Sequence, residues 1–370
     1  MTTAESPMAT SDLADLARAS VELIVSLQDP SGAYPASPTF SAYRGFSWFR
    51  DGAFIADGVS SAGAVESASA FFGWCSRIIV ERRAAIERIA AAAAAGVPVP
   101  DAEMLATRFT FDGREGDDEW WDFQLDGYGT WIWAAVEHAE RHDLSLEAWA
   151  PAIGLTVDYL IASWARPCFD WWEENAAEVH VSTLGCIAGG LAAVLRAGIL
   201  DPTSETAARA TLGAIQATIA DEGTRDGHLV KWIGSVEVDA SLASMVHPLG
   251  VIGGEVARAT LAQIERQLTV DGGVHRYSWD TFFGGGQWPL LSCFLGLAHV
   301  RLGDTGRALE LLNWAATTVT SEGHLPEQVA THLIDNSMVA EWVDRWGTVA
   351  TPLLWSHAMF VRLAVELEVI

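Results

Sequence analysis

The amino-acid sequence predicts an all-α protein, an (α/α)6 barrel of six helical hairpins, in a single domain that spans residues 1–370. Apolar residues recur at the i, i+3, i+4 spacing of amphipathic helices, and alternating strand-like runs are few. Short and long connections alternate, and most of the long ones carry clusters of Trp, Arg, Asp or Glu. No run of Gly, Ser, Pro or like charges reads as a linker, so a single domain is expected.

Twelve helices are expected, and several have recognisable ends. Asp51, Asp126 and Asp304 stand close to expected helix starts, where an Asp side chain can accept a bond from a free backbone N–H. Gly303 is a candidate C-cap in a link short enough to make its two helices antiparallel neighbours. The expected helices cover residues 10–28, 53–80, 82–95, 128–142, 147–164, 180–197, 203–220, 240–250, 254–268, 287–302, 304–320 and 352–368.

The even-numbered helices of this series each follow a long connection and are richer in Gly, Ala and other apolar residues. Five of the six long connections contain Trp, Arg, Asp or Glu clusters, and the sixth ends in Val238-Asp239-Ala240-Ser241. Six hairpins closed into a ring place all of these connections at one end of the barrel. We therefore expect the functional site at that end.

Composition excludes several classes of function. With 48 acidic and 22 basic residues the formal net charge is −26, whereas nucleic acids and anionic membranes need a basic footprint. Neither the cysteines nor the histidines show a metal-ligand spacing, so no metal site is expected. No signal-peptide pattern or membrane-length apolar segment occurs, which predicts a soluble, cytoplasmic protein with free, buried thiols.

Two loops carry carboxyl groups with unlike surroundings. Glu173 and Glu174 follow Trp172, and a carboxyl group beside indoles loses solvation, which raises its pKa and suits a general acid. Glu327, after Pro326, is the candidate general base. Hydrolysis of a glycosidic bond uses such a pair, although a double Glu is more often a solvated surface pair. His180 and Ser182 raise the alternative of a serine nucleophile, but no G-x-S-x-G motif accompanies them.

Other long connections hold residues suited to hydroxyl-rich ligands. Arg50 beside Asp51 offers fixed donors and an acceptor for neighbouring hydroxyls; the alternative is a helix cap with a surface ion pair. Trp120 and Trp121 stand in a polar loop where burial alone explains them poorly, and indole faces pack on the C–H faces of sugar rings.

Further along, Trp131 and Trp133 stand at helical spacing and fit the core equally well. Arg276 can orient a ring hydroxyl or form a buried ion pair with Asp280. The triple glycine at 284–286 lacks the Lys and Ser/Thr of a phosphate loop, which excludes a nucleotide site of that kind.

Taken in order, these loops resemble the glucoamylase-type glycoside hydrolases, family fifteen, from Tyr43 to Ala358. The matching segments are Trp48-Phe49-Arg50-Asp51, Gln124-Leu125-Asp126-Gly127-Tyr128-Gly129, Trp172-Glu173-Glu174, Val238-Asp239-Ala240-Ser241, His275-Arg276-Tyr277, Pro326-Glu327-Gln328 and Leu354-Trp355-Ser356-His357-Ala358.

The resemblance implies an (α/α)6 barrel and exo-acting, inverting release of β-glucose from the non-reducing ends of α-glucosides. It implies Glu173 as the general acid, Glu327 as the general base and no cofactor. Inversion requires the two carboxyl groups to stand roughly 6.5–9.5 Å apart. The expected substrate contacts are Tyr43, Trp48, Arg50, Asp51, Trp120, Gln124, Asp126, Trp172, Glu174, Arg276 and Trp355.

The chain departs from the family in two ways. We expect neither the N-terminal β-sandwich nor the separate carbohydrate-binding domain of many members. The stretch between Glu327 and Trp355 is long and contains Trp342-Val343-Asp344-Arg345-Trp346, an aromatic segment that can cover the site. Both features favour a short, neutral saccharide, with isomaltose first and α-1,4 oligosaccharides or trehalose as alternatives.

Two other functions remain open. Sugar epimerases share the barrel but depend on catalytic histidines, for which His180, His247 and His357 are available. A non-catalytic sugar-binding protein needs no second carboxylate opposite Glu173.

Overall fold

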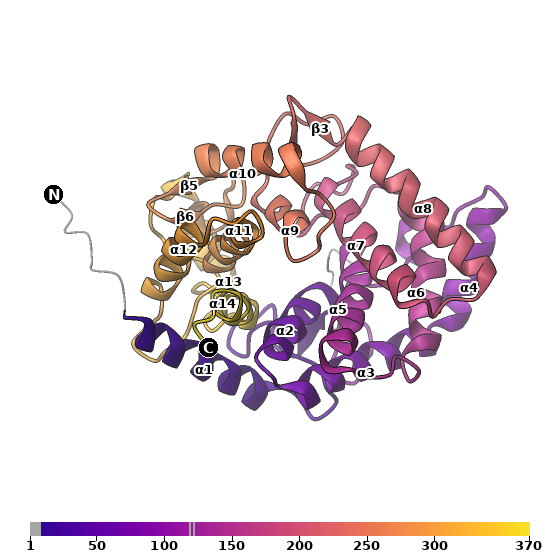
Figure 1. Cartoon of the computed structure of the whole chain (residues 1–370), viewed down its shortest axis with the longest axis horizontal. Coiled ribbons are helices and arrows are strands. Elements are labelled where there is room, and N and C mark those ends of the chain that lie inside the picture. The colour runs from indigo at the N-terminus through magenta and orange to yellow at the C-terminus, as the bar shows by residue number, and fades with distance from the viewer. Residues whose placement is uncertain (1–8, 118–119, 121–122) are drawn as a thin grey trace.

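The structure is a computed structural model that describes residues 9–117, 120 and 123–370. Figure 1 shows the helices as two concentric rings, which confirms the (α/α)6 barrel. The inner ring consists of α2 (Phe49–Ser61), α5 (Asp126–His142), α7 (Val181–Ala197), α9 (Ala243–Val246), α11 (Pro289–Arg301) and α14 (Leu354–Glu366). The outer ring consists of α1 (Thr10–Leu27), α3 (Val65–Glu81), α6 (Ala150–Ser163), α8 (Pro202–Asp221), α10 (Gly254–Leu268) and α12 (Thr305–Thr317). Each inner helix packs on the next, and α14 closes the ring against α2.

The remaining elements lie in the connections. Two further helices are α4 (Arg83–Ala94) and α13 (Val339–Trp346). Three short antiparallel pairs join β1 (Phe46–Trp48) to β2 (Arg108–Thr110), β3 (Thr224–Arg225) to β4 (His228–Leu229), and β5 (Thr269–Val270) to β6 (Gly273–Val274). The register of the first pair places Trp48 opposite Arg108. These pairs fix loops at the barrel end that the sequence marked as functional.

Two predicted helices differ from the structure. The single helix expected over 53–80 is wrong, because α2 and α3 are separate helices joined by a turn at Gly63, whose φ of +90° favours glycine. The helix expected over 240–250 is shorter, since a 3-10 turn at Ala240–Leu242 leads into α9, which ends before Pro248. Proline lacks the N–H that would continue the helix. The inner-ring helices α2, α5, α7, α9, α11 and α14 each overlap an even-numbered helix of the predicted series.

Small residues let the inner helices approach closely. A Cβ atom on Gly129 of α5 would lie 2.4 Å from the carbonyl oxygen of Cys186, and one on Gly190 of α7 would lie 2.4 Å from that of Gly129. Real Cβ atoms do not approach so closely, so both positions require glycine. This explains why inner helices are enriched in Gly and Ala.

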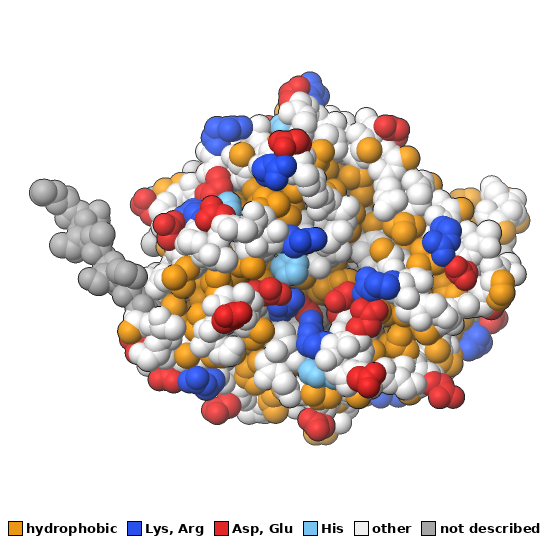
Figure 2. Space-filling view, viewed as in Figure 1, with side chains coloured by type: hydrophobic (Ala, Val, Ile, Leu, Met, Phe, Trp, Pro, Cys, Tyr) orange, Lys and Arg blue, Asp and Glu red, His pale blue; other side chains and the backbone are white. Residues whose placement is uncertain are grey.

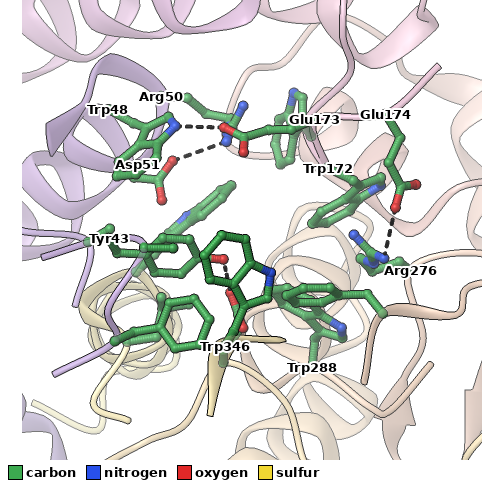
Figure 3. Close-up of a pocket in the computed structure, with 18 of the residues that line it drawn as sticks. Tyr43, Trp48, Arg50, Asp51, Trp172, Glu173, Glu174, Arg276, Trp288 and Trp346 are labelled. Atoms are coloured by element: carbon green, nitrogen blue, oxygen red, sulfur yellow. Dashed lines mark hydrogen bonds and ion pairs between the residues drawn. The ribbon is translucent and has the colours of Figure 1, made fainter. Parts of the chain in front are cut away.

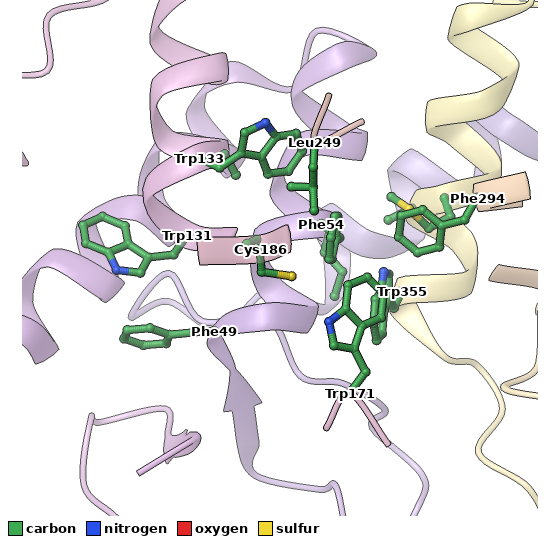
Figure 4. Close-up of a cluster of buried hydrophobic side chains, with 14 of the residues drawn as sticks. Phe49, Phe54, Trp131, Trp133, Trp171, Cys186, Leu249, Phe294 and Trp355 are labelled. Atoms are coloured by element: carbon green, nitrogen blue, oxygen red, sulfur yellow. The ribbon is translucent and has the colours of Figure 1, made fainter. Parts of the chain in front are cut away.

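Aromatic side chains fill the barrel interior (Figure 4). Phe54 of α2 stacks on Trp355 of α14, with ring centroids 5.5 Å apart and planes 9° apart. Trp171 and Phe294 pack against the same pair. Trp131 is fully buried between the two rings, where its Nε1 donates to Thr156 Oγ1 of the outer helix α6 at 3.2 Å. Trp133 is buried as well.

The four cysteines are free and buried, as the sequence predicted. Within the described ranges, no helix combines the length and the apolar character that crossing a bilayer demands. Figure 2 shows acidic and basic side chains interspersed on one face, with charged side chains around the hollow at the centre of the ring.

Candidate active site

One cavity of about 140 Å³ opens at the end of the barrel where the long connections meet. This volume is below the roughly 300–1,000 Å³ of most ligand pockets, which favours a small ligand. Figure 3 shows its walls, which come from segments far apart in the sequence. The lining includes Phe40, Tyr43, Trp48, Arg50, Asp51, Trp120, Trp171, Trp172, Glu173, Glu174, Arg276, Phe282, Trp288, Glu327, Trp342, Trp346 and Trp355.

The structure therefore brings together nearly every residue that the sequence assigned to the site. Gln124 and Asp126 do not line the cavity but lie directly behind it. The Arg50 guanidinium donates to Gln124 Oε1 at 2.6 Å and to Asp126 Oδ2 at 3.2 Å. Trp121 falls outside the described residues.

Arg50 is 5% exposed, so the alternative of a surface ion pair is wrong. Its Nη2 lies 3.3 Å from Asp51 Oδ2, and Asp51 lines the cavity beside it. Burial raises the pKa of Asp51 to about 6, against the opposing effect of Arg50. The pair presents a fixed donor and an acceptor to the cavity, as gripping neighbouring hydroxyls requires.

Glu173 is held by indole and amide donors. Trp48 Nε1 donates to its Oε1 at 2.7 Å, as Figure 3 shows, and Gln124 Nε2 donates to the same oxygen at 3.2 Å. Burial raises the pKa of Glu173, although Arg50 and these donors act in the opposite direction. Its backbone has a φ of +63°, an uncommon conformation for a residue other than glycine.

Glu327 occupies a different environment in the same cavity. Tyr43 Oη donates to its Oε1 at 2.9 Å, while the buried Oε2 accepts no hydrogen bond from the residues that the structure describes. Burial raises the pKa of Glu327 to about 8, and the Tyr43 bond and the charge of Arg276 oppose this. Glu173, which is half-buried, and Glu327, which is buried, thus line one small cavity with unlike hydrogen-bond partners.

Glu174 belongs to a separate ionic cluster at the cavity edge. Arg276 Nη2 donates to its Oε1 at 3.3 Å, and Tyr277 Oη donates to its Oε2. Arg276 also donates from Nε to Asp280 Oδ2 at 2.8 Å. The two interpretations of Arg276 are therefore compatible, because its buried ion pair with Asp280 orients a guanidinium that lines the cavity.

Aromatic rings form most of the remaining wall. Trp120 packs edge-on against Trp48 at 5.9 Å and beneath the Arg108 guanidinium at 3.9 Å. Trp172 packs against Trp288 at 5.5 Å. Trp346 belongs to α13, the aromatic segment that the sequence placed over the site, and this segment is helical. The cavity is thus apolar on its walls and polar at a few fixed points.

Some residues around the site were not predicted from the sequence. Phe40 and Trp288 line the cavity, and their aromatic character alone does not distinguish them from core residues. Lys231 is buried near Asp170 and Asp239, which it contacts through Nζ. The sequence holds a signal for Lys231, because it is the single lysine of the chain beside 21 arginines.

The histidines available to an epimerase do not line the cavity. His357 bonds with Ser20 and with the backbone N–H of Leu325. His247 contacts Glu366, and His180 bonds with a backbone carbonyl. Within the described part of the chain, no cluster of His, Cys, Asp and Glu has the arrangement of a metal site.

Comparisons with known proteins agree with this geometry. Residues 13–365 match the family described as Glycosyl hydrolases family 15. An isomaltose glucohydrolase of Kribbella flavida is 51% identical over 96% of this chain and 93% of its own length. A solved wild-type glycosidase is 50% identical over 98% of both chains, with a TM-score of 0.95. The glucoamylase of Saccharomycopsis fibuligera, 14% identical with a TM-score of 0.73 over 100% of this chain and 98% of its own, shares the fold.

Proposed function

The chain belongs to the glycosyl hydrolases family 15, and from that premise we propose that it is an exo-acting, inverting α-glucosidase. It releases β-glucose from the non-reducing end of short α-glucosides, with isomaltose as the preferred substrate. The observation that carries the proposal is that Glu173, which is half-buried, and Glu327, which is buried, line one small cavity in unlike surroundings.

We assign the general acid to Glu173 and the general base to Glu327. In this scheme the glycosidic oxygen takes a proton from Glu173 as its bond to the anomeric carbon breaks. A water molecule gives its proton to Glu327 Oε2 as its oxygen attacks the opposite face of the same carbon. Burial raises the pKa of both glutamates, so the two roles follow the family segments Trp172-Glu173-Glu174 and Pro326-Glu327-Gln328 and not the pKa values. The unpartnered Oε2 of Glu327 supports a water ligand.

The remaining contacts fit a terminal glucose residue. Arg50 and Asp51 supply a donor and an acceptor on one side of the cavity, and Arg276 with Glu174 supplies them on the other. Trp120, Trp172 and Trp355 offer ring faces between them. Because no charged ligand is implied, the substrate class is a neutral saccharide.

The proposed preference for short substrates depends on the aromatic residues that line the cavity. Trp342 and Trp346 of α13 and the neighbouring Phe40 line the cavity. These rings limit the space for a long aglycone. The K. flavida relative is named for isomaltose, which supports the same choice over α-1,4 oligosaccharides and trehalose. Four free thiols fit a reducing compartment and support a cytoplasmic location.

The test is glucose release from isomaltose, maltose, trehalose, dextran and soluble starch, with the product anomer followed by NMR. We expect β-glucose from isomaltose and little glucose from the polymers. Glu173→Gln and Glu327→Gln should each lower kcat by about 10²–10⁴-fold, the usual contribution of acid–base catalysis. α-Glucose as the first product, or full activity of either variant, contradicts the mechanism; a preference for starch contradicts only the substrate choice.

A further inference from the structure

Lys231 is an unusual residue in this chain. It is the single lysine, beside 21 arginines, so the surface of the protein makes no use of lysine. Its side chain is only 2% exposed. Lysine is almost never fully buried unless it is paired, so a lone buried lysine needs a specific partner.

The Lys231 ammonium bridges two buried aspartates. Nζ lies 2.9 Å from Asp170 Oδ2 and 2.5 Å from Asp239 Oδ2, and both carboxylates are almost completely buried. Burial disfavours the charged ammonium, but the two carboxylates outweigh it and raise the pKa of Lys231. The Lys231 ammonium is therefore charged at neutral pH.

Asp170 uses its other oxygen to hold the turn that carries Glu173. Oδ1 accepts the backbone N–H of Trp172 at 2.9 Å and that of Glu174 at 2.9 Å. Backbone bonds from Glu173 N to Asp170 O and from Asp170 N to Glu174 O, each 3.0 Å, close the same turn. These four bonds bracket Glu173, whose positive φ is an uncommon conformation that needs such support.

Asp239 fixes the neighbouring indole. Its Oδ2, which also contacts Lys231, accepts the Nε1–H of Trp172 at 2.9 Å. Its Oδ1 accepts the backbone N–H and the hydroxyl of Ser241 at 2.8 and 2.6 Å. The Lys231 ammonium also lies 4.2 Å from the ring centroid of Tyr277, which donates to Glu174. The Lys231 ammonium therefore contacts the groups that hold Trp172, Glu173 and Glu174 in place.

We propose that Lys231 is a positioning residue for the general acid: its ammonium joins Asp170 and Asp239 and thereby holds the turn at 170–174 in the conformation that aims Glu173 into the cavity. This inference rests on the proposed role of Glu173. Lysine suits the position better than arginine, because a compact ammonium meets two converging carboxylate oxygens, whereas a planar guanidinium spreads its donors.

The experiment compares Lys231→Met and Lys231→Arg with the wild-type enzyme on two substrates. Isomaltose has a leaving group that needs a proton, and α-glucosyl fluoride has one that needs it far less. Arg362→Met is the matched control, because Arg362 is also buried in an ion pair, with Asp57, but does not line the cavity. Thermal unfolding of every variant is measured alongside.

We expect Lys231→Met to lower kcat for isomaltose by about 10²-fold, the usual effect of misplacing a catalytic group, while KM changes little. The loss on glucosyl fluoride is at least about tenfold smaller, and Lys231→Arg restores part of kcat. Arg362→Met lowers the melting temperature without changing the ratio of the two activities. Equal losses on both substrates, or wild-type kcat in a folded Lys231→Met variant, overturn the proposal.

Two further measurements distinguish a failure of the proposal for Lys231 from a failure of the proposed function. If Lys231→Met does not fold, the ratio of the two activities in Lys231→Arg decides: a lowered ratio supports the proposal and an unchanged one overturns it. Glu173→Gln is measured in parallel. If it retains activity on isomaltose, the proposed function itself fails, whereas its loss together with wild-type behaviour of the lysine variants removes only the role of Lys231.

A measurement on the wild-type enzyme needs no variant. Because the chain has one lysine, ¹⁵N-lysine labelling yields a single side-chain signal. A buried, doubly paired ammonium exchanges its protons slowly, so we expect this signal to be observable at neutral pH and to shift when glucose is added. A signal broadened by rapid solvent exchange, or one indifferent to glucose, contradicts the proposal.

Discussion

At the residue scale, the site separates two chemically identical side chains by their partners. Glu173 receives N–H donors from Trp48 and Gln124, and Glu327 receives the hydroxyl of Tyr43. Neither environment can be read from the neighbouring sequence, since every donor comes from a distant loop. The sequence therefore singled out the two glutamates that the structure places in the cavity, but not the groups that hold them.

The Tyr43 hydroxyl provides a pH test. Its bond stabilises ionised Glu327 and opposes the effect of burial, and the pKa of Glu327 with this bond in place is about 8. Tyr43→Phe removes the bond, the pKa rises further, and the acid limb of the kcat/KM profile moves to higher pH. We expect kcat/KM at pH 7 to fall about 10-fold, as for a hydrogen bond to a charged group. The full pH profile of both enzymes is the measurement, and an acid limb that moves to lower pH contradicts the assignment of Glu327 as the base.

At the element scale, periodicity predicted most helices, and its failures have local causes. The break between α2 and α3 depends on Gly63, whose backbone freedom does not interrupt the apolar pattern on either side. The helix α13 was expected only as an aromatic segment, because it packs over the cavity rather than into the core and has no buried residue. Periodicity could not identify Lys231, because a single residue forms no repeating pattern.

The helix α13 is expected to limit substrate length. Trp346→Ala removes a ring that lines the cavity, so kcat/KM for longer α-glucosides should rise on the order of 10-fold relative to isomaltose. Val343→Ala is the matched control, because Val343 belongs to the same helix but does not line the cavity. Specificity constants for a series of isomalto-oligosaccharides measure the effect. An unchanged ratio in Trp346→Ala removes the argument that α13 restricts the aglycone.

At the scale of the whole molecule, one ionic network joins three inner helices. Asp57 of α2 accepts two hydrogen bonds: Arg141 Nη2 of α5 donates to its Oδ1 at 2.6 Å, and Arg362 Nε of α14 donates to its Oδ2 at 2.9 Å. Burial raises the pKa of Asp57, but the two arginines outweigh it, and the pKa ends below its ordinary 3.8. The network therefore stabilises the fold above pH 3.8, and that contribution is lost as the pH falls through the pKa of folded Asp57.

The Arg362→Met variant tests whether this ionic network stabilises the barrel. Removing one partner of a buried ion pair costs about 3–5 kcal/mol, so we expect a loss of this size in the free energy of unfolding at pH 7. The difference from the wild type should shrink towards acid, where Asp57 becomes protonated. Urea unfolding across pH measures it, with kcat as the control. A loss that grows on acidification contradicts the assigned charge state.

The sequence predicted the barrel as a whole because short and long connections alternate regularly along the chain. The organisation of residues 1–370 as one domain and a cytoplasmic location stay predictions. The placement of charges behind the cavity required the structure, because burial is a property of packing and not of local pattern.

The bond between Asp57 and Arg362 spans 305 positions of the chain, and it bears on how the protein is synthesised. Glu327 and Trp355 leave the ribosome long after Arg50 and Glu173, and α14 must emerge before α2 gains its last neighbour. Contacts of such long range are slow to form, because a large loop must close before they stabilise anything. During translation the first inner helices therefore keep one flank uncovered until α14 has emerged and the ring is complete.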